Sequence, residues 1–530
     1  MTINKWNPNR EITKPEQAIL RRLRRHKKLF AFLREQRHEL FDDKFQDELA
    51  AMYRDTGAGK EPITPALMAM ATLLQDYSGV SDAEVVERTV MEKRWQLVLG
   101  CLGAEEPAFS QGAFWDFRER FIAHDMDRRF LERTREVAKK CGGFDYRKLP
   151  KKLRVAVDSS PLEGAGRVED TMNLLGHGAR KLVSIVAALL GMTFAEVATA
   201  AGSPLLLESS VKAGLDLRWD KPGAVDAGLE TLLVQLDSLQ AWITEHLPEP
   251  SEHPRLQESL ATLDDIRQQD ITVESGIPQI RQGTAKERRI SIEDSEMRHG
   301  RKSKSRTING YRRHIALDLD MSLILACAVT PANQQEHHAA RELADDIEQQ
   351  GEKIGELYID RGYLASEVVT EVDRGGSIVC RPWKVSNDNG LFSKLDFNIN
   401  VRDKLITCPA GQQKSFEFGR SVRFKAKVCD ECPIRSQCTA AKPGHGRSVH
   451  IAKNEKLHKR LRKQAATPQG RKELRKRVAV EHSLAHISQR QGNRARYNGT
   501  RKNLFALRRS AIVHNLEAIQ RSSRRHAKAA

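Results

Sequence analysis

The sequence lacks a hydrophobic run long enough to cross a membrane. Its longest apolar stretch, residues 182–192, falls short of the roughly 20 residues that a bilayer requires and runs toward Glu196, so we interpret it as a core helix. The basic segment 21–28 is not followed by an apolar segment of the signal-peptide kind. We therefore expect a protein that is not exported, stays in the cytoplasm and makes no membrane contact.

Cysteine is also scarce. Eight cysteines in 530 residues are too few for a disulfide scaffold and favour a reducing compartment. Four of them cluster in one segment: Cys408, Cys429, Cys432 and Cys438. The spacing of Cys429 and Cys432 is that of a zinc knuckle. Two interpretations stay open, a structural Zn²⁺ site, with His445 as a substitute ligand, or unliganded thiols packed in a small subdomain.

Acidic residues are nearly absent from the C-terminal part of the chain. Residues 442–530 contain 24 Lys and Arg against four acids, a net charge of +20, whereas the whole chain carries +18. Because this basic block is interleaved with apolar positions at helical spacing, it has the electrostatic character of a folded nucleic-acid surface. The alternative is a solvated basic face, the usual role of a run of charges.

The order of predicted elements indicates a mixed α/β sheet. A short strand at 153–158 is followed much later by a hairpin at 311–320 and 323–330, a helix at 337–350, a strand ending before Asp360, a helix at 365–373 and a strand at 377–381. Helices are available for both faces of such a sheet. A helical hairpin inserted after the first strand ends in a flexible basic stretch, 298–306.

The N-terminal 150 residues read as successive short helices. Thr64 and Pro65 begin one helix, and Ser81 has the capping-box spacing to Glu84. A third helix carries aromatic and basic residues, which suits either a helix-turn-helix DNA module or a plain helical bundle. We divide the chain into an N-terminal helical unit (1–150), an α/β core (151–160, 311–386 and 470–520), a mainly helical insertion (161–310), a cysteine-rich insertion (387–469) and a basic tail (521–530).

Three carboxylates are candidates for a shared metal site. Asp158 and Asp360 each follow a strand-like run, and Glu481 falls on the apolar face of a predicted helix, where it would point toward the core. Acidic oxygens placed by a rigid sheet suit two Mg²⁺ ions that act on a phosphodiester. Each acid also has a simpler explanation, because Asp is a common turn residue and Glu481 could pair with Arg477 one turn earlier.

Several segments resemble those of a known family. They are Ile359-Asp360-Arg361-Gly362-Tyr363, Gly310 to Asp318, Arg477-x3-Glu481, Gly300 to Ser305, Cys408-Pro409-Ala410-Gly411, Cys429-x2-Cys432-Pro433-x4-Cys438 and Tyr77 to Asp82. Together they are similar to the signature segments of bacterial insertion-sequence transposases of the DDE class. The resemblance extends over most of the chain.

That resemblance implies a ribonuclease H-like catalytic domain in which Asp158, Asp360 and Glu481 bind two Mg²⁺ or Mn²⁺ ions. Asp170 is the chief rival to Asp158, but it follows no strand. The basic residues expected to contact DNA are Arg301, Lys302, Lys304, Lys476, Arg477, Arg490, Arg494 and Arg496. The chain departs from a related pattern at Leu474, where a Tyr is common, and at Ser488, where a Lys is common; Arg490 or Lys476 is the candidate for the missing charge.

The implied activity is metal-dependent cleavage of a DNA strand at the terminal inverted repeats of an insertion sequence, followed by strand transfer into target DNA. Since two ends must be joined, we expect a dimer or higher homo-oligomer assembled on double-stranded DNA, associated with the bacterial nucleoid. Two alternatives remain. One is a catalytically inactive DNA-binding protein derived from a transposase, and the other is a stand-alone metal-dependent nuclease.

Overall fold

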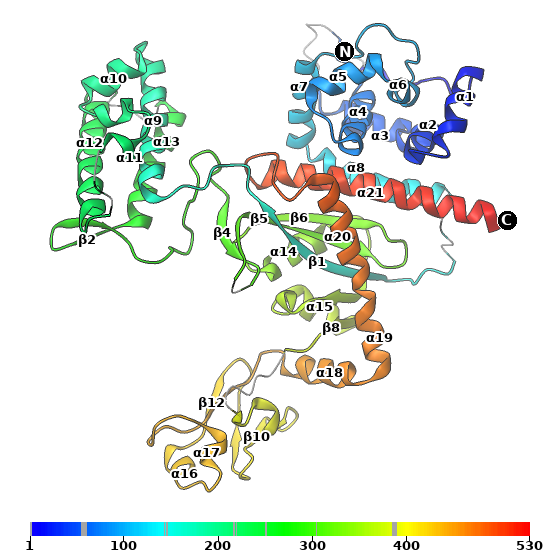
Figure 1. The fold of residues 1–530 in the computed structure, drawn as a ribbon. Helices are drawn as coiled ribbons and strands as arrows, with labels where there is room; N and C mark the ends of the chain where they lie inside the picture. Colours follow the sequence, from blue (N-terminus) through cyan, green and yellow to red (C-terminus); the bar gives the residue numbers. More distant parts are fainter. Residues whose placement is uncertain are drawn as a thin grey trace.

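A mixed β-sheet forms the centre of the molecule (Figure 1). The computed structural model describes the chain apart from residues 1–2, 55–60, 142–143, 145–146, 216–217, 219, 248, 250–251, 304, 384–389 and 530, and its described side chains end at Arg524. The strands of the sheet are β1 (Leu153–Glu163), β4 (Arg298–Arg301), β5 (Thr307–Asp318), β6 (Ile324–Pro331), β7 (Ile354–Ile359) and β8 (Ser377–Cys380). The prediction of a mixed α/β sheet is confirmed.

The sheet combines antiparallel and parallel pairs. Strand β5 pairs antiparallel with β4, β6 and β1, whereas β1 pairs parallel with β7, and β7 pairs parallel with β8. The predicted hairpin is β5–β6. Two expectations were wrong: β1 does not end at Asp158 but continues to Glu163, and the basic segment expected to be flexible contains strand β4. Both differences have the same cause. Residues after Asp158 and residues 298–301 pair with β5 and are therefore part of the sheet.

Alternation along β1 assigns its side chains to two different cores. Val155 and Val157 pack into a cluster with α14 (Ala339–Gln349), α15 (Glu367–Gly375) and α18 (Glu455–Ala466). Ala156 and Leu162 point the other way, into a cluster with α20 (Val478–Gln491) and α21 (Thr500–Ala529). Because side chains alternate between the faces of a strand, Asp158 shares the face of Ala156 and lies toward α20.

The N-terminal helices share their core with the sheet. They are α1 (Lys14–Leu23), α2 (Lys28–Leu40), α3 (Asp43–Ala50), α4 (Pro65–Ser78), α5 (Asp82–Met91), α6 (Lys93–Leu99), α7 (Gln111–Ala123) and α8 (Met126–Lys140). Helix α21 runs between them and the sheet, with α8 alongside it (Figure 1). In α7, Arg118 is buried and donates two hydrogen bonds of 2.8 Å to Asp82. Arg118 therefore forms an ion pair within the N-terminal helical unit.

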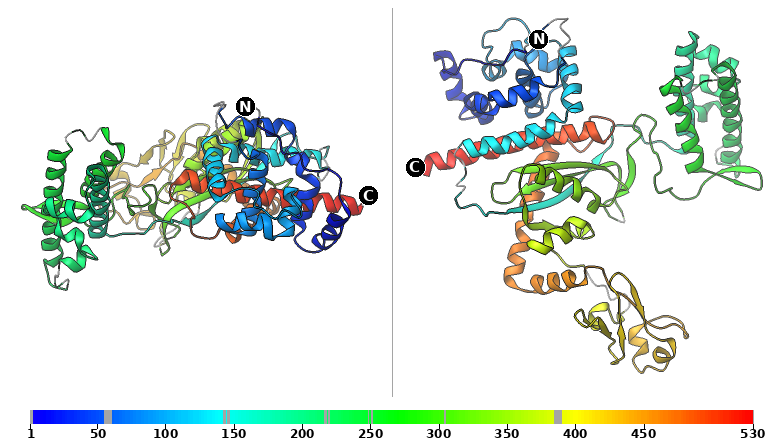
Figure 2. Two further views of the ribbon diagram at one scale, coloured as in Figure 1. Left: turned by 90° about the horizontal axis from the view of Figure 1, so that it is seen from above. Right: turned by 180° about the vertical axis from the view of Figure 1, so that it is seen from behind.

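A separate helical unit stands to one side of the sheet (Figure 2). It contains α9 (Thr171–Leu190), α10 (Phe194–Ala200), the 3-10 turn Pro204–Leu207, α11 (Val211–Gly214), α12 (Ala224–His246), α13 (Pro254–Asp270) and the hairpin β2 (Ile271–Glu274) and β3 (Ile277–Ile280). It is thus larger than the helical hairpin expected. No single helix among the described residues is long and apolar enough to span a bilayer; α9 and α10 meet both conditions only as a pair, which is bent by 106°.

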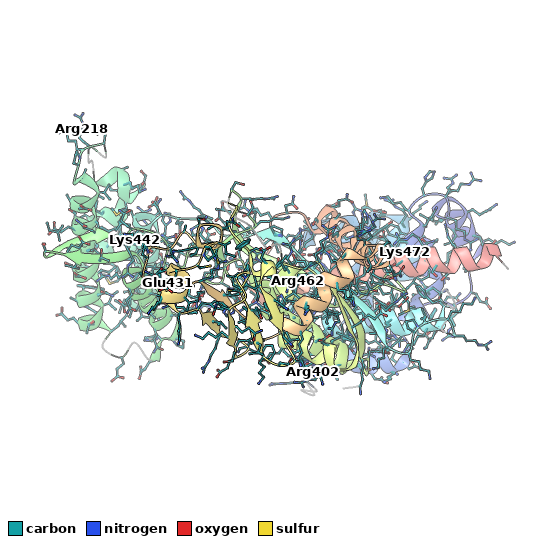
Figure 3. All side chains as sticks on the ribbon, turned by 90° about the horizontal axis from the view of Figure 1, so that it is seen from below. Arg218, Arg402, Glu431, Lys442, Arg462 and Lys472 are labelled. Atoms are coloured by element: carbon teal, nitrogen blue, oxygen red, sulfur yellow. The ribbon has the colours of Figure 1, made fainter. Side chains whose placement is uncertain are left out.

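The cysteine-rich segment forms a small lobe with its own apolar cluster. Its elements are β9 (Asn398–Asn400), β10 (Leu405–Thr407), β11 (Gln413–Ser415), β12 (Ser421–Arg423), α16 (Ala426–Asp430), α17 (Arg435–Cys438) and β13 (Ser448–His450). Helices α18 and α19 (Pro468–Lys476) return the chain from this lobe to the sheet. Arg402 of the lobe and Lys472 of α19 are both visible when the molecule is seen from below (Figure 3).

Candidate active site

Asp158 and Asp360 lie on neighbouring parallel strands. Ala156 of β1 is paired with Tyr358 of β7, so the residues two positions further on, Asp158 and Asp360, come to similar heights and to the same face of the sheet. Asp360 directly follows β7, as predicted, and accepts a hydrogen bond of 2.6 Å from the backbone N–H of Gly362. The sheet therefore brings these two carboxylates together at one place.

Glu481 reaches the same place from α20, but by a different route from the one predicted. Its side chain is 47% exposed, so the expectation that it points into the core is wrong. The buried face of α20 is formed instead by Val480, Ser483, Leu484, Ile487 and Gln491. The prediction took Leu474 and Glu481 to belong to one helix. Helix α19 ends at Lys476 and α20 begins at Val478, and this break changes which side chains share a face.

Arg477, at the junction of these helices, joins the acids. Its guanidinium donates one hydrogen bond of 2.9 Å to Oδ2 of Asp158 and a second, one turn along the helix, to Oε1 of Glu481. Burial raises the pKa of Asp158 to about 6; Arg477 opposes this increase, while Asp360 and Glu481 add to it. Asp360 and Glu481 thus act electrostatically on Asp158, and one guanidinium holds Asp158 and Glu481.

All three acids line one large cleft of about 1430 Å³. A fourth acid, Glu336, lies in the same cleft and was not predicted from the sequence. It accepts hydrogen bonds from Oγ of Ser159, at 2.5 Å, and from Nη1 of Arg312, at 3.1 Å. It comes from the 3-10 turn Glu336–His338 after β6, and nothing in its local sequence distinguishes it from a surface acid.

A buried hydrogen-bond network supports the acids from behind. Ser159 contacts both Glu336 and the hydroxyl of Tyr363. One ring nitrogen of His314 lies 2.7 Å from that hydroxyl, and the other lies 3.0 Å from Oγ1 of Thr330. Burial lowers the pKa of His314 to about 3, with Arg312 adding to the effect, so the ring is neutral. The network fixes the acidic edge of the cleft without adding charge to it.

The donor set of the cleft suits a hard divalent cation. Carboxylate oxygens from two strands and a helix are the ligands that Mg²⁺ and Mn²⁺ prefer. As the side chains stand, the described part of the chain contains no group of three or more His, Cys, Asp or Glu residues arranged to hold a metal ion. The guanidinium of Arg477 occupies the position between Asp158 and Glu481. The chemistry of these oxygen donors fits a divalent cation, and Arg477 stands between two of the carboxylates that would hold it.

The basic residues predicted to contact DNA occupy different environments. Arg301 and Lys302 line the cleft, and Lys304 lies outside the described residues. Lys476 pairs with Glu473 at 2.7 Å, and Arg490 pairs with Glu517 at 3.0 Å. Arg494 donates to the carbonyls of Gly164 and Ala165, whereas Arg496 is exposed.

Part of the basic block is internal. Arg508 and Arg509 of α21 are buried; Arg508 pairs with Asp125, Asp127 and Asp346, and Arg509 with Asp76. These arginines join the N-terminal helices and α14 to α21. The positive charge of the C-terminal segment therefore serves folding as well as the surface.

An aromatic side chain that was not predicted as a site residue, Trp383, lies at the rim of the cleft. Trp383 is 50% exposed, and the guanidinium carbon of Arg361 lies 6.0 Å from the centre of its ring. Arg361 directly follows Asp360, so both side chains border the acidic edge. A large exposed aromatic ring beside a cation is a surface on which a nucleic-acid base stacks well.

The four clustered cysteines surround one small cavity of about 30 Å³, enough for a single ion or water molecule. Burial raises the pKa of Cys438, Arg447 opposes this, and the three other thiols add to the increase. His445 is exposed, and its backbone carbonyl accepts a hydrogen bond of 3.5 Å from Arg435. The four thiols thus lie around one cavity, although in the described part of the chain they are not arranged as a group that could hold a metal ion.

Comparison with known families gives two matches. A family described as "Transposase domain (DUF772)" matches residues 20–120, which include α2 to α6 and most of α7, and a family described as "Transposase DDE domain" matches residues 407–520, which include the four cysteines and Glu481. No curated protein and no solved structure matches the chain. Both matches are to transposase domains, and the second includes the helices that carry Arg477 and Glu481; together they support an insertion-sequence transposase of the DDE class.

Proposed function

We propose that this chain cleaves DNA strands at the terminal inverted repeats of an insertion sequence and transfers them to target DNA, with Asp158, Asp360 and Glu481 as its metal-binding residues. The observation that carries the proposal is the position of Arg477. It links a strand acid and a helix acid 323 positions apart in the chain, while Asp360 stands on the next strand. Carboxylates that are clustered in this way at the edge of a sheet are typical of a functional site and not of an ordinary solvent-exposed surface.

A ribonuclease H-like fold is part of the proposal. The strand order β6-β5-β1-β7-β8, with three antiparallel strands followed by two parallel ones, supports it. So do helices on both faces of the sheet and an acid on the central strand β1. Fold analogy alone does not establish activity, so the proposal rests on the acids.

When bound between the three acids, two Mg²⁺ or Mn²⁺ ions would activate the attacking oxygen and stabilise the leaving one. Arg477 would then release the carboxylates and pair with a DNA phosphate, and Lys476 would approach the same strand. Arg301 and Lys302, on the opposite wall of the cleft, would hold the duplex. The reaction would take place on nucleoid DNA in the cytoplasm, in a dimer or larger assembly that holds two DNA ends.

We also propose that Cys408, Cys429, Cys432 and Cys438 bind a structural Zn²⁺ ion. The ion-sized cavity that the four thiols share supports this proposal. The purified protein should contain one zinc per chain by elemental analysis, and Cys429→Ser should lose both the metal and the fold of the lobe. A metal-free wild-type protein with the same stability would contradict it.

The activity is tested with a labelled duplex that carries the end of the element, incubated with Mg²⁺ and either the wild-type protein or Glu481→Gln. Wild-type protein should cleave and join strands, and the variant should bind DNA without cleaving it. Equal binding without cleavage by both proteins would identify an inactive DNA-binding protein. Cleavage of arbitrary DNA without joining would identify a nuclease instead.

A further inference from the structure

A second basic concavity lies outside the catalytic cleft, where the two ends of the chain meet. Its volume is about 410 Å³, and we call it the terminal pocket. It is lined by Lys27, Lys28, Leu29, Tyr77, Glu517, Gln520, Arg521 and Arg524. Helix α2 lies beside the C-terminal half of α21 there (Figure 1). The basic segment 21–28, to which the proposed function gives no role, thus meets the basic end of α21.

Positive charge in the terminal pocket is poorly compensated. Its lining contains four cations and one acid, Glu517, which already pairs with Arg490 at 3.0 Å. The ring of Tyr77 is flanked by Lys27 and Arg490, each 5.9 Å from its centre. A concave surface that gathers like charges concentrates the field and attracts anions. A cationic or neutral ligand would leave that repulsion in place.

Two further features supply hydrogen-bond donors for an anion. Gln520 is only 7% exposed, and its Nε2 has no hydrogen-bond partner among the described residues. Helix α2, 13 residues long, begins at Lys28, and its N-cap Lys27 provides no side-chain hydrogen bond to the first turn. The N-terminus of a helix carries partial positive charge and free N–H groups, which favour phosphate. A buried amide without a partner is costly unless a ligand completes it.

We propose that the terminal pocket binds a backbone phosphate of double-stranded DNA outside the catalytic cleft. This inference rests on the proposed function, since it assigns a second contact to the same DNA. Exposed cations continue beyond the pocket along the end of α1 and the loop that follows, at Arg21, Arg22 and Arg25. A row of such contacts suits the repeating phosphates of a duplex better than a single free anion.

Helix α20 connects the terminal pocket to the cleft. Its residues Glu481, Leu484, Ala485 and Ser488 line the cleft, and Arg490, two positions further on, approaches Tyr77 on another side of the helix. From Glu481 to Arg490 the helix rises about 14 Å, at roughly 1.5 Å per residue. The two sites are close enough for one DNA molecule to contact both.

The test compares Lys27→Glu/Arg521→Glu with a control that removes the same charge elsewhere, Lys221→Glu/Arg402→Glu, at two exposed positions in the helical unit and the cysteine lobe. Affinity for a duplex is measured over a range of salt concentrations. The pocket variant should bind more than tenfold more weakly, and the slope of log K against log salt should decrease by about one, since each phosphate contact contributes about 0.9. The control should bind as the wild-type protein does.

A second variant tests the pocket with a smaller change, in case the charge reversals prevent folding. Gln520→Leu keeps the size of the side chain and its apolar packing but removes the amide, and it should weaken DNA binding by roughly tenfold. Thermal unfolding of both variants establishes that they are folded. At saturating DNA both should still cleave, whereas Glu481→Gln should bind and not cleave. Loss of binding and loss of chemistry are therefore separate results, which distinguishes failure of the pocket from failure of the proposed function.

A third measurement uses inorganic phosphate as the probe. Phosphate should raise the unfolding temperature of the wild-type protein above that in chloride at the same ionic strength, and the pocket variant should lose this increase. If phosphate stabilises the wild-type protein but DNA affinity is the same in the wild-type and pocket variants, the pocket takes a free anion and the assignment to DNA is wrong. If neither measurement changes in the pocket variant, no phosphate binds there.

Discussion

At the scale of single residues, Gly362 explains how two acids approach each other. A Cβ atom at this position would lie 2.0 Å from Oε2 of Glu336 and 3.0 Å from Oδ1 of Asp360. Both contacts are closer than van der Waals distance, so glycine leaves room for the two carboxylates where they stand and a larger residue would displace the carboxylate of Glu336. The glycine in the Asp360-Arg361-Gly362-Tyr363 segment is therefore required by space in the site.

We predict that Gly362→Ala abolishes most DNA cleavage, because the new methyl group displaces Glu336 and Asp360 together. A loss of at least a hundredfold in the cleavage rate is expected, since small displacements of reacting groups cost about that much. Gly375 provides a matched control, because a Cβ there would have no neighbour within 4 Å. Gly375→Ala should cleave at the wild-type rate. Equal rates for both variants would mean that the cleft tolerates the displacement.

Glu336 itself is predicted to position the catalytic acids. It accepts a hydrogen bond from Ser159, the neighbour of Asp158 in β1, and it lies against Gly362, two residues after Asp360. Glu336→Gln keeps the shape but weakens both contacts, so metal affinity and cleavage should fall roughly 10- to 100-fold, as for other residues that orient metal ligands. The Mn²⁺ concentration needed for half-maximal cleavage should rise, while DNA affinity stays constant.

The exposed Glu367 at the start of α15 serves as the control for Glu336. Glu367→Gln should need no additional Mn²⁺. A merely structural role for Glu336 would lower the unfolding temperature without changing the Mn²⁺ requirement, and that outcome would remove Glu336 from the site.

At the scale of elements, α21 depends on a histidine that stays neutral. His514 is 5% exposed; burial lowers its pKa to about 4, and Arg521 and His486 add to the decrease. An unfolded histidine has a pKa near 6.5, so between about pH 6.5 and 4 the unfolded chain binds a proton that the folded protein does not. Stability from this group is complete above pH 6.5 and is lost as the pH falls toward 4.

We predict that His514→Gln removes this part of the pH dependence. A difference of about 2.5 pKa units corresponds to about 3 kcal/mol, so His514 should contribute up to that amount to the decrease in the wild-type free energy of unfolding between pH 7 and pH 4, and the free energy of the variant should decrease less. Urea unfolding at several pH values measures it. The variant of an exposed residue, His445→Gln, should unfold like the wild-type protein. An unchanged slope in His514→Gln would contradict the assignment.

Sequence patterns predicted the elements that local signals define. Thr64, Pro65 and Gly79 delimit α4, and β7 ends before Asp360, because caps, turns and short β-branched runs are local properties. The extension of β1 to Glu163 was missed because the prediction ended this strand at Asp158, a residue type common in turns; the missed part contains Pro161. Beyond Ala156, however, only β5 of the sheet pairs with β1, so a proline within this strand is tolerated.

The contacts that complete the site could not be predicted in this way. Glu336 enters the cleft through tertiary packing, and the exposure of Glu481 depends on a break between α19 and α20 that its neighbours in sequence do not reveal. The pairing of Glu481 with Arg477 was foreseen only as a simple helical ion pair. The second hydrogen bond of Arg477, to Asp158, becomes visible only in the folded structure, because Asp158 and Glu481 lie 323 positions apart in the sequence.

At the scale of the whole molecule, some structural units share one hydrophobic core, whereas the inserted helical unit has a separate core. The N-terminal helices and one face of the sheet share a single apolar cluster through α21, and the buried ion pairs of Arg508 reinforce that junction. The helical unit that begins at α9 has a cluster of its own, whose members all lie between residues 172 and 292. The first arrangement makes one cooperative body, and the second makes an appended one.

We therefore predict that residues 171–280 can be removed without unfolding the rest. Thr171 and Arg281 both hydrogen-bond to Asp270, so their backbones lie close together and a short Gly-Ser linker can join Asp170 to Arg281. The deletion keeps Lys286 in the wall of the cleft and removes all but one of the buried residues of the separate cluster, leaving Ile292.

The shortened protein should remain monodisperse in gel filtration and should unfold in one transition at nearly the wild-type temperature. The excised segment, produced alone, should be helical by circular dichroism and unfold cooperatively, since its core needs no partner. A fragment without cooperative unfolding, or a shortened chain that aggregates, would mean that the two cores stabilise each other across the 165–170 and 281–297 connections. In that case the helical unit would be part of the folding of the sheet, and any role in DNA binding could not be tested by deleting it.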